Sequence, residues 1–146
     1  MFETDNYIVS WEQSKYIVAS SFLFMFPAFY AYYTSQYFFA YFLFATTVFS
    51  ANYWRKATFF WRRNADLVFA KISFALFFVN GIMYVKYVPY IVSFYSCLIL
   101  LVYCYYLSGK LHLQNNNNWI KYHVLFHVLS ISAILLVLDE MKQIKM

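Results

Sequence analysis

The sequence is poor in the residues that build most soluble folds and many small-molecule sites. It has two cysteines, two glycines and two prolines among 146 residues, and charged side chains make up only 12%. A soluble domain carries about 25% charged residues. A chain of this length also has too little interior to hide its hydrophobic residues, which make up 64%. The shortage of charge therefore excludes an ordinary soluble domain and favours a membrane protein.

The same shortages exclude several kinds of functional site. The chain contains no Cys-x-x-Cys pair, phosphate-binding loop, dinucleotide-binding glycine pattern, His-Glu-x-x-His motif or potassium-filter sequence. Cys97 and Cys104 are seven residues apart, about 10 Å along one helix, which is too far for a disulfide. We expect both to be small packing residues. The net charge is +5, but no basic run is long enough for a nucleic-acid surface, so we expect no nucleic-acid partner.

What the chain has instead is a series of long apolar stretches. Each approaches the roughly 20 residues with which a helix crosses a membrane, and backbone groups in lipid must be hydrogen-bonded internally, which favours helices. We predict an all-α polytopic membrane helix bundle of about five transmembrane helices, at residues 16–33, 37–53, 65–85, 90–107 and 119–138. This domain (15–138) follows a polar amino-terminal segment (1–14) and precedes a short charged tail (139–146). Pro27 should kink the first span, because it removes a backbone donor and crowds the preceding turn.

The cations are unevenly divided between the two ends of these spans. Five crossings place the amino terminus, the 54–64 segment and the 108–118 loop on one side. The cations of that side are Lys15, Arg55, Lys56, Arg62, Arg63, Lys110 and Lys121. The positive-inside rule then predicts a cytosolic amino terminus and a carboxyl terminus on the opposite side. All four tryptophans fall on the basic side, where an interfacial anchor belt is expected: Trp11, Trp54, Trp61 and Trp119.

A few polar side chains interrupt the apolar stretches near the basic side. Such groups are costly in hydrocarbon and usually face the bundle interior or serve a function. His123 and His127 are four residues apart, so they share one helical face with a spacing suited to zinc. Ser50 ends the second span and Asp66 opens the third, toward the same membrane face. A zinc ion there could activate water for hydrolysis of a lipid amide or ester, with Asp66 orienting the water.

Each of these residues also has a purely structural interpretation. Paired histidines at helical spacing are often interfacial groups, and Asp66 favours the start of a helix. A buried serine such as Ser50 often bonds back to its own helix. Lys71 can extend toward the basic side or neutralise an acid on a partner subunit. A small channel or proton-conducting protein that uses Asp66, Lys71 and His123 remains a further alternative.

The pattern of Ser50, Asp66 and His123-x-x-x-His127 resembles the membrane hydrolase superfamily that includes alkaline ceramidases and progestin/adipoQ-type receptors. Members typically have seven spans and a zinc ion bound by three histidines. The superfamily pattern has Ser-x-x-x-His on one span, Asp on the next and His-x-x-x-His on the last. The resemblance therefore implies a helical membrane fold and a zinc-dependent lipid hydrolase. Loss of two middle spans would preserve the sidedness.

The chain departs from that pattern at one ligand. The residue four after Ser50 is Trp54 instead of histidine, so one expected zinc ligand is absent. Only His112, in the loop before the last span, is available to replace it. Segments 53–55, 62–66 and 121–123 also resemble uncharacterised multi-pass membrane proteins of large DNA viruses, a likeness that implies no activity.

These observations favour a small multi-pass integral membrane protein with a degenerate hydrolase-like site. We expect a non-catalytic structural or assembly subunit without a cofactor. Its aromatic exterior would contact the bilayer and either other membrane subunits or a second copy of itself. The alternative is a zinc-dependent, ceramidase-like lipid amidase or esterase. In that enzyme Asp66 and Ser50 would serve catalysis, and His123, His127 and His112 would hold the metal.

Overall fold

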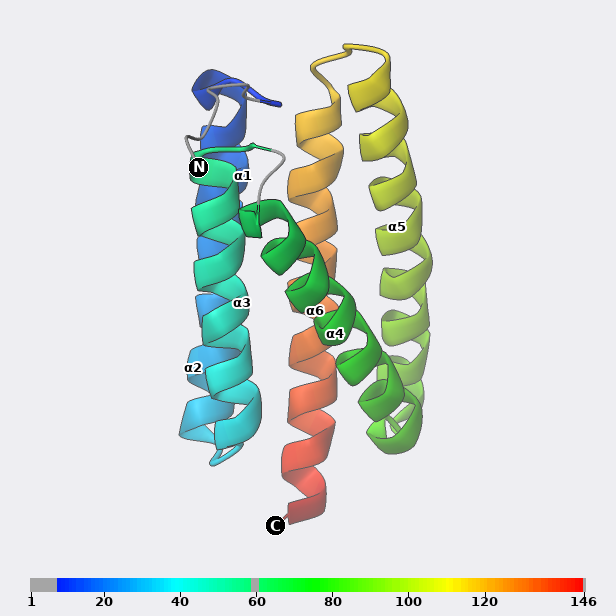
Figure 1. The fold of residues 1–146 in the computed structure, drawn as a ribbon. Coiled ribbons are helices and arrows are strands. Elements are labelled where there is room, and N and C mark those ends of the chain that lie inside the picture. The colour runs from blue at the N-terminus through cyan, green and yellow to red at the C-terminus, as the bar shows by residue number, and fades with distance from the viewer. Residues whose placement is uncertain (1–7, 59–60, 146) are drawn as a thin grey trace.

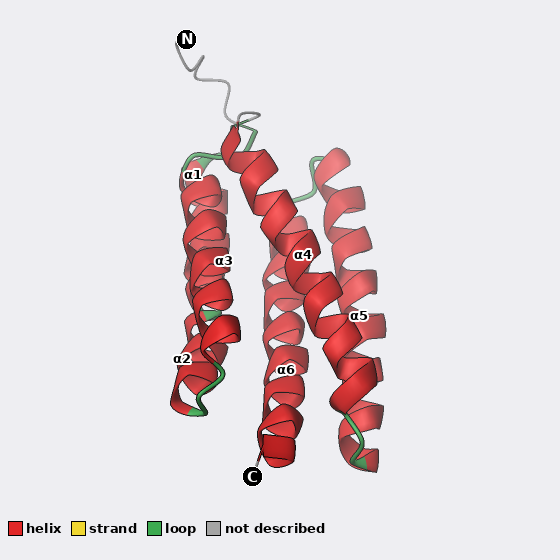
Figure 2. Cartoon of the chain, turned by 60° about the horizontal axis from the view of Figure 1, so that its bottom comes forward, coloured by secondary structure: helices red, strands yellow, loops and turns green. Residues whose placement is uncertain are grey.

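A computed structural model describes residues 8–58 and 61–145 of the chain. Helices and their connecting segments make up this part of the chain, and no strand occurs in it (Figure 2). The helices are, in chain order, α1 (Trp11–Phe22), α2 (Met25–Tyr33), α3 (Tyr37–Arg55), α4 (Trp61–Tyr84), α5 (Val88–Leu113) and α6 (Trp119–Lys145). The expected all-α bundle is confirmed. Because α1 and α2 lie end to end, these helices make five passes along the bundle (Figure 1).

Most of the passes are candidates for crossing a membrane. Four are long and apolar enough, namely Trp11–Tyr33, Trp61–Tyr84, Val88–Leu113 and Trp119–Ile144. The remaining helix, α3, has 19 residues but is less apolar, because it contains several tyrosines, two threonines and Asn52. It packs along α1 and α2 (Figure 1). The other four passes are enough to support an integral membrane location.

The first pass is broken near its middle, as Pro27 predicts. α1 ends at Phe22 and α2 begins at Met25. The break between them lies about one turn before Pro27, whose ring crowds the carbonyl four residues back. The backbone N–H groups of Leu23 and Phe24 bond three residues back, at 3.1 and 3.2 Å. This tighter pattern is a 3₁₀ turn. The expected kink is therefore confirmed as a short break between two helices of one pass.

α6 occupies the centre of the bundle. It packs against α1 and α2 on one side and runs antiparallel along α5 on the other, while α4 crosses it obliquely (Figures 1 and 2). α1 begins at one end of the bundle and α6 ends at the opposite end (Figure 1). α6 is 27 residues long and continues to Lys145. The segment expected as a charged tail is therefore helical up to that residue.

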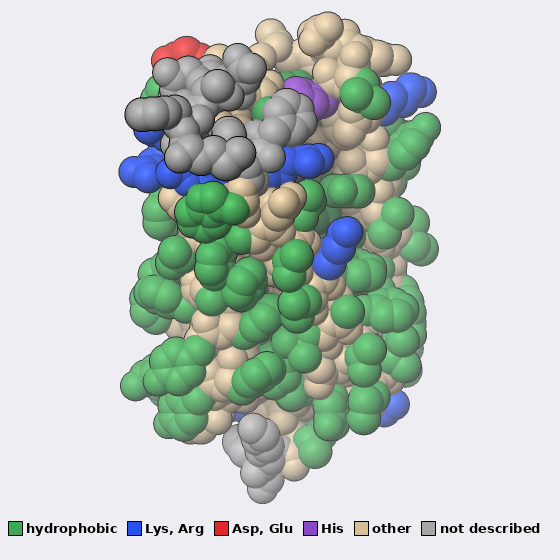
Figure 3. All heavy atoms as spheres, viewed as in Figure 1, with side chains coloured by type: hydrophobic (Ala, Val, Ile, Leu, Met, Phe, Trp, Pro, Cys, Tyr) green, Lys and Arg blue, Asp and Glu red, His purple; other side chains and the backbone are tan. Residues whose placement is uncertain are grey.

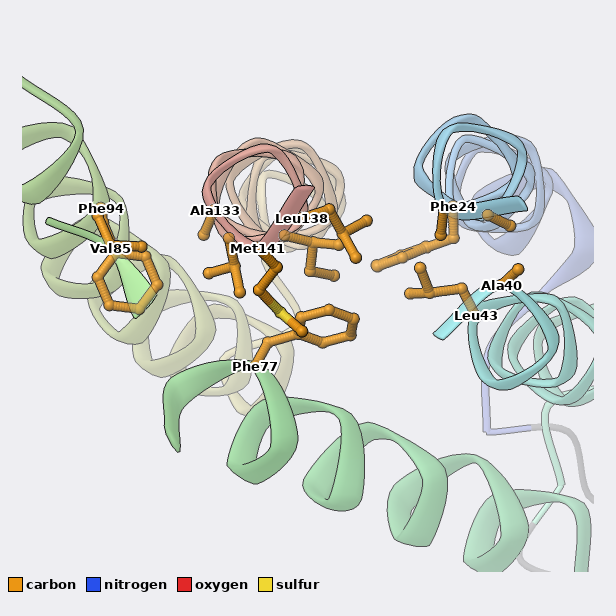
Figure 4. Close-up of a cluster of buried hydrophobic side chains, with 13 residues drawn as sticks. Phe24, Ala40, Leu43, Phe77, Val85, Phe94, Ala133, Leu138 and Met141 are labelled. Carbon is orange, nitrogen blue, oxygen red and sulfur yellow. The ribbon is translucent and has the colours of Figure 1, made fainter. Parts of the chain in front are cut away.

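The core lies between α6 and the helices around it. Leu43 of α3, Phe77 of α4 and Leu138 of α6 are all at most 4% exposed and belong to one buried cluster (Figure 4). Ala40 and Ala133 belong to the same cluster. Small residues let neighbouring helices approach closely, and in lipid such packing replaces the hydrophobic driving force that operates in water.

A glycine sets the distance between the end of α4 and the start of α5. A Cβ atom added to Gly81 would lie 2.1 Å from Cζ of Phe94. The Phe94 side chain is only 1% exposed, so its ring has little room to move away. Gly109, in the last turns of α5, has nothing within 4 Å of an added Cβ. Gly81 is therefore required by packing, whereas Gly109 is not.

Apolar side chains cover the outside of the bundle. On the face shown in Figure 3 they fill the middle, and most of the visible cationic side chains lie toward the end at which α1 begins. Trp11 and Trp61 are exposed there, as an anchor belt requires, at 53% and 59%. Trp54 and Trp119 are instead buried, because they pack inward around His123. Only half of the expected belt therefore faces the surroundings.

Candidate functional site

The two histidines of α6 point into the bundle. Their ring centroids are 5.0 Å apart. His127 is 4% exposed, and its Nδ1 lies 2.8 Å from the Ser20 hydroxyl oxygen on α1. His123 is half-buried, and its Nδ1 lies 3.3 Å from the Ser108 hydroxyl oxygen on α5. The pair therefore joins the central helix to the helices on both of its sides.

A second set of polar contacts continues from α1 to the other two passes. Ser21, next to Ser20, has its hydroxyl oxygen 3.0 Å from that of Ser50 on α3. Ser50 in turn interacts with the Asp66 carboxylate, at the start of α4, as a hydrogen-bond partner. Ser20 and Ser21 are themselves buried. Adjacent serines on one helix thus reach α6 on one side and α3 on the other.

Ser20 and Ser21 also contact the backbone of their own helix. Their hydroxyl oxygens lie 3.0 and 2.8 Å from the carbonyl oxygen of Ile17. Each serine has a single hydroxyl hydrogen. If both serines donate to that carbonyl, the bonds to the other helices reverse: His127 donates its Nδ1–H to Ser20, and Ser50 donates to Ser21.

These contacts form a single polar layer, which we define as Ser20, Ser21, Ser50, Asp66, Ser108, His123 and His127. The layer ties all five passes together near one end of the bundle. Four of its members are the residues singled out in the sequence, and the structure brings them to the same level. The three other serines were missed. Serine is common in membrane helices and gives no signal in the sequence when it points at another helix.

Aromatic rings cover the polar layer on the side of the basic end. The Trp54 ring lies edge-on to that of His123, with centroids 4.8 Å apart, and the Trp119 ring centroid is 6.2 Å from it. His112 is half-buried and stays outside the hydrogen-bonded layer, with its ring centroid 4.8 Å from that of Trp119. Phe24 packs against His127 from the other direction. Trp54 thus occupies the place expected for a third histidine and turns toward the site, but its indole cannot bind a metal.

The polar layer can be compared with the ligand set of a zinc centre. A catalytic zinc site keeps three protein ligands and one water. Within residues 8–58 and 61–145, no group of three His, Cys, Asp or Glu side chains could hold a metal ion. Asp66 interacts with Ser50, and the hydrogen bonds of His123 and His127 go to serines on other helices. In the described part of the chain these side chains therefore link helices through hydrogen bonds.

A second polar cluster lies toward the opposite end of the bundle. Asp139 of α6 accepts hydrogen bonds from the Tyr30 hydroxyl at 2.5 Å and from the Tyr90 hydroxyl at 3.1 Å. These three residues line a cavity of about 240 Å³. In the sequence, Asp139 adjoins Glu140 at the predicted end of the last span, so it was assigned to the charged tail. The structure shows instead that it joins α2, α5 and α6.

Between the two polar clusters, α6 contributes apolar side chains to the core. Ala133, Ile134, Val137 and Leu138 are all at most 5% exposed and part of the buried cluster. His127 and Asp139 are twelve residues apart, about 18 Å along the helix. The polar layer itself runs across the bundle, from α1 and α6 to α3, α4 and α5. The proton-conducting alternative stays a hypothesis.

The remaining polar residue singled out in the sequence, Lys71, lies outside the polar layer. It is exposed on α4, ten residues after Trp61, which is about 15 Å along the helix. Exposed apolar neighbours on the same helix include Val68, Ile72 and Phe74. Within the described residues, no carboxylate forms an ion pair with Lys71. The Lys71 ammonium group therefore lies on the apolar outer surface of the bundle.

Comparison with known proteins leaves the function to be argued from this geometry. No protein-family model matches the chain, and neither a curated protein nor a solved structure does. The resemblances to the membrane hydrolase superfamily and to viral membrane proteins therefore stay predictions. Of the two cysteines expected as packing residues, Cys104 is buried and Cys97 is half-buried, and both thiols are free.

Proposed function

We propose that this protein is a non-catalytic subunit of a membrane protein assembly, bound to a partner through α4. The observation that carries this proposal is the exposed Lys71 in the middle of an apolar helix. A lysine within a membrane span is rare and costly, and it usually pairs with an acid or reaches the interface. A partner helix with an aspartate or glutamate at the matching depth would neutralise it.

The packing of α4 supports the same proposal. Only Ser73, Phe77 and Gly81 are buried among its 24 residues, and they form one stripe at every fourth position. Many other residues of α4 expose apolar side chains, so a second helix has a broad surface on which to pack. They are Val68, Ile72, Phe74, Phe78, Val79, Ile82 and Met83. In lipid, such contacts are stabilised by close packing and by interhelical polar bonds.

A partner of different sequence fits better than a second copy of this chain. The four acids among the described residues, Glu12, Asp66, Asp139 and Glu140, already have hydrogen-bond partners within this chain. Moving one of them to Lys71 of another copy would break those bonds. The partner should therefore bring its own acid. In this proposal the polar layer fixes the relation of the passes and takes no part in chemistry.

The test is co-purification in mild detergent with two substitutions at one position. Lys71→Met keeps the length of the side chain and removes its charge, whereas Lys71→Arg keeps the charge. We expect the methionine variant to lose a stoichiometric partner and the arginine variant to retain it. Lys110→Met, at an exposed position in the last turns of α5, is the matched control and should also retain it.

Charge exchange makes the test specific for the proposed pair. Lys71→Asp should abolish the complex, and lysine in place of the partner's intramembrane acid should restore it. An unchanged complex with Lys71→Met would show that Lys71 reaches lipid headgroups instead. A monodisperse monomer that is fully functional alone would also contradict the proposal.

A further inference from the structure

A groove between α1 and α6 is separate from both polar clusters and from the exposed surface of α4. Its volume is about 620 Å³, and it is open to the surroundings along much of its surface. It is lined by Tyr16 of α1, Asn117 of the preceding loop, and Ile120, Lys121, Val124, Leu125 and Val128 of α6. We call this feature the α1–α6 groove.

The α1–α6 groove has a polar end and an apolar end. Asn117 and Lys121 lie at the start of α6, on the basic side of the bundle, and the next lining residues are apolar. From Lys121 to Val128 the helix advances seven residues, about 10 Å. The groove therefore runs from the expected membrane surface into the hydrocarbon, as a lipid chain does. Gln13 holds the polar end in place by donating to the Asn117 side chain at 2.7 Å.

The charge at the polar end selects one class of ligand. Lys121 is exposed, and no ion pair with it occurs among the described residues. The nearby Lys15 is already paired with Glu12. An ammonium group above an apolar groove complements a phosphate group that carries an alkyl chain. A partner helix would need an acid at this one position to neutralise the charge, whereas every anionic phospholipid carries a phosphate at the depth of the headgroups.

We propose that the α1–α6 groove binds an anionic glycerophospholipid, with one acyl chain along Val124 and Val128 and its phosphate at Lys121. The Asn117 amide is available to bond the headgroup or its glycerol oxygens. This site differs from the general lipid surface of the bundle in two respects. It is hollowed, and its charge is placed at the depth of a headgroup. The proposal is independent of the partner proposed at Lys71.

The test measures which lipids stay bound to the purified full chain. Reconstitute it in nanodiscs of phosphatidylglycerol and phosphatidylcholine in equal amounts, extract it in mild detergent, and count bound lipids by native mass spectrometry. We expect a several-fold preference for phosphatidylglycerol. Lys121→Gln should reduce this to equal retention, whereas Lys110→Gln, an exposed control on the same side, should leave the preference intact. Val128→Phe should fill the apolar end and lower the retention of both lipids.

Three results would overturn the proposal. Wild-type protein could retain the two lipids equally, or the two lysine substitutions could lower retention to the same degree, which would indicate general surface charge. A photoreactive residue at position 128 could cross-link to a second protein chain instead of lipid. A thermal melt of each variant confirms that the bundle is folded. Val128 is 40% exposed, so its substitution should not unfold the chain.

Discussion

The bond between Ser20 and His127 joins α1 to α6 at 2.8 Å, and it can be tested by substitution. Ser20→Ala should lower the free energy of unfolding by about 1 kcal/mol, within the range measured for polar contacts between membrane helices. His127→Leu should cost more, because it also disturbs packing. The double variant should be less destabilised than the sum of the two single changes in free energy, since both substitutions remove the same bond.

Ser132→Ala is the control. Its hydroxyl bonds its own helix, and we expect a change within about 0.5 kcal/mol. Additive effects in the cycle, measured by reversible unfolding in detergent, would contradict the role of this bond.

Trp54 offers a residue-scale test of what separates this chain from a zinc hydrolase. Its ring lies against His123, so Trp54→His should bring a third imidazole to the pair. We expect zinc to raise the melting temperature of this variant but not that of Trp54→Phe or the wild type. Metal analysis of the purified wild type and of His123→Ala is the complementary measurement. Stoichiometric zinc in the wild type that is lost in His123→Ala would make the zinc-dependent lipid amidase or esterase the favoured hypothesis.

The sequence revealed the polar layer unevenly, for a physical reason. Ser50, Asp66, His123 and His127 stand out because polar groups are rare in apolar stretches, and their order along alternating spans places them on one side. Ser20 and Ser21 do not stand out, since serines in such helices commonly bond their own backbone, as Ser130 and Ser132 do, and these two reach other helices in addition to bonding Ile17. Which partner a serine takes depends on helix rotation, which the sequence alone does not give.

At the scale of the element, the two glycines should respond in opposite ways. Gly81→Ala forces a Cβ into the buried Phe94 ring and should lower the free energy of unfolding by about 1–3 kcal/mol, the usual cost of overpacking. Gly109→Ala meets no neighbour and should stabilise its helix by about 0.5–1 kcal/mol. Both are measured by unfolding in detergent. If the two alanine variants melt alike, the close approach of α4 and α5 is not set by Gly81.

Most of the helices could be predicted from the sequence. The apolar stretches predict the number of passes, and Pro27 predicts the break in the first pass. The ends differed more: α5 extends to Leu113 and α6 to Lys145, beyond the predicted limits. Polar residues such as Lys110 and Lys142 interrupt the apolar pattern, and the predicted spans end before them. A helix can continue past an apolar stretch because its backbone hydrogen bonds do not depend on apolar side chains. The oblique course of α4 was not predictable, because it follows from packing at Phe77 and Gly81.

For the whole molecule, the five passes predict termini on opposite sides of the membrane. A glycosylation acceptor or a single cysteine placed near each terminus in turn should be modified from different sides. The cation distribution predicts that the amino terminus is the cytosolic one. Replacement of Arg55, Lys56, Arg62 and Arg63 by glutamine should weaken this preference and give a mixed orientation. Modification of both termini from one side would contradict five crossings.

The modest hydropathy of α3 bears on how the chain enters a membrane during its synthesis. A translocation channel releases segments into lipid according to how apolar they are, and α3 is the pass that falls short. It follows α2 after a turn of only a few residues, and its Ser50 bonds to Ser21 of α1. Hairpin formation before release would hide these polar groups. The first two passes would therefore leave the channel together, and their pairing would come before the arrival of α6.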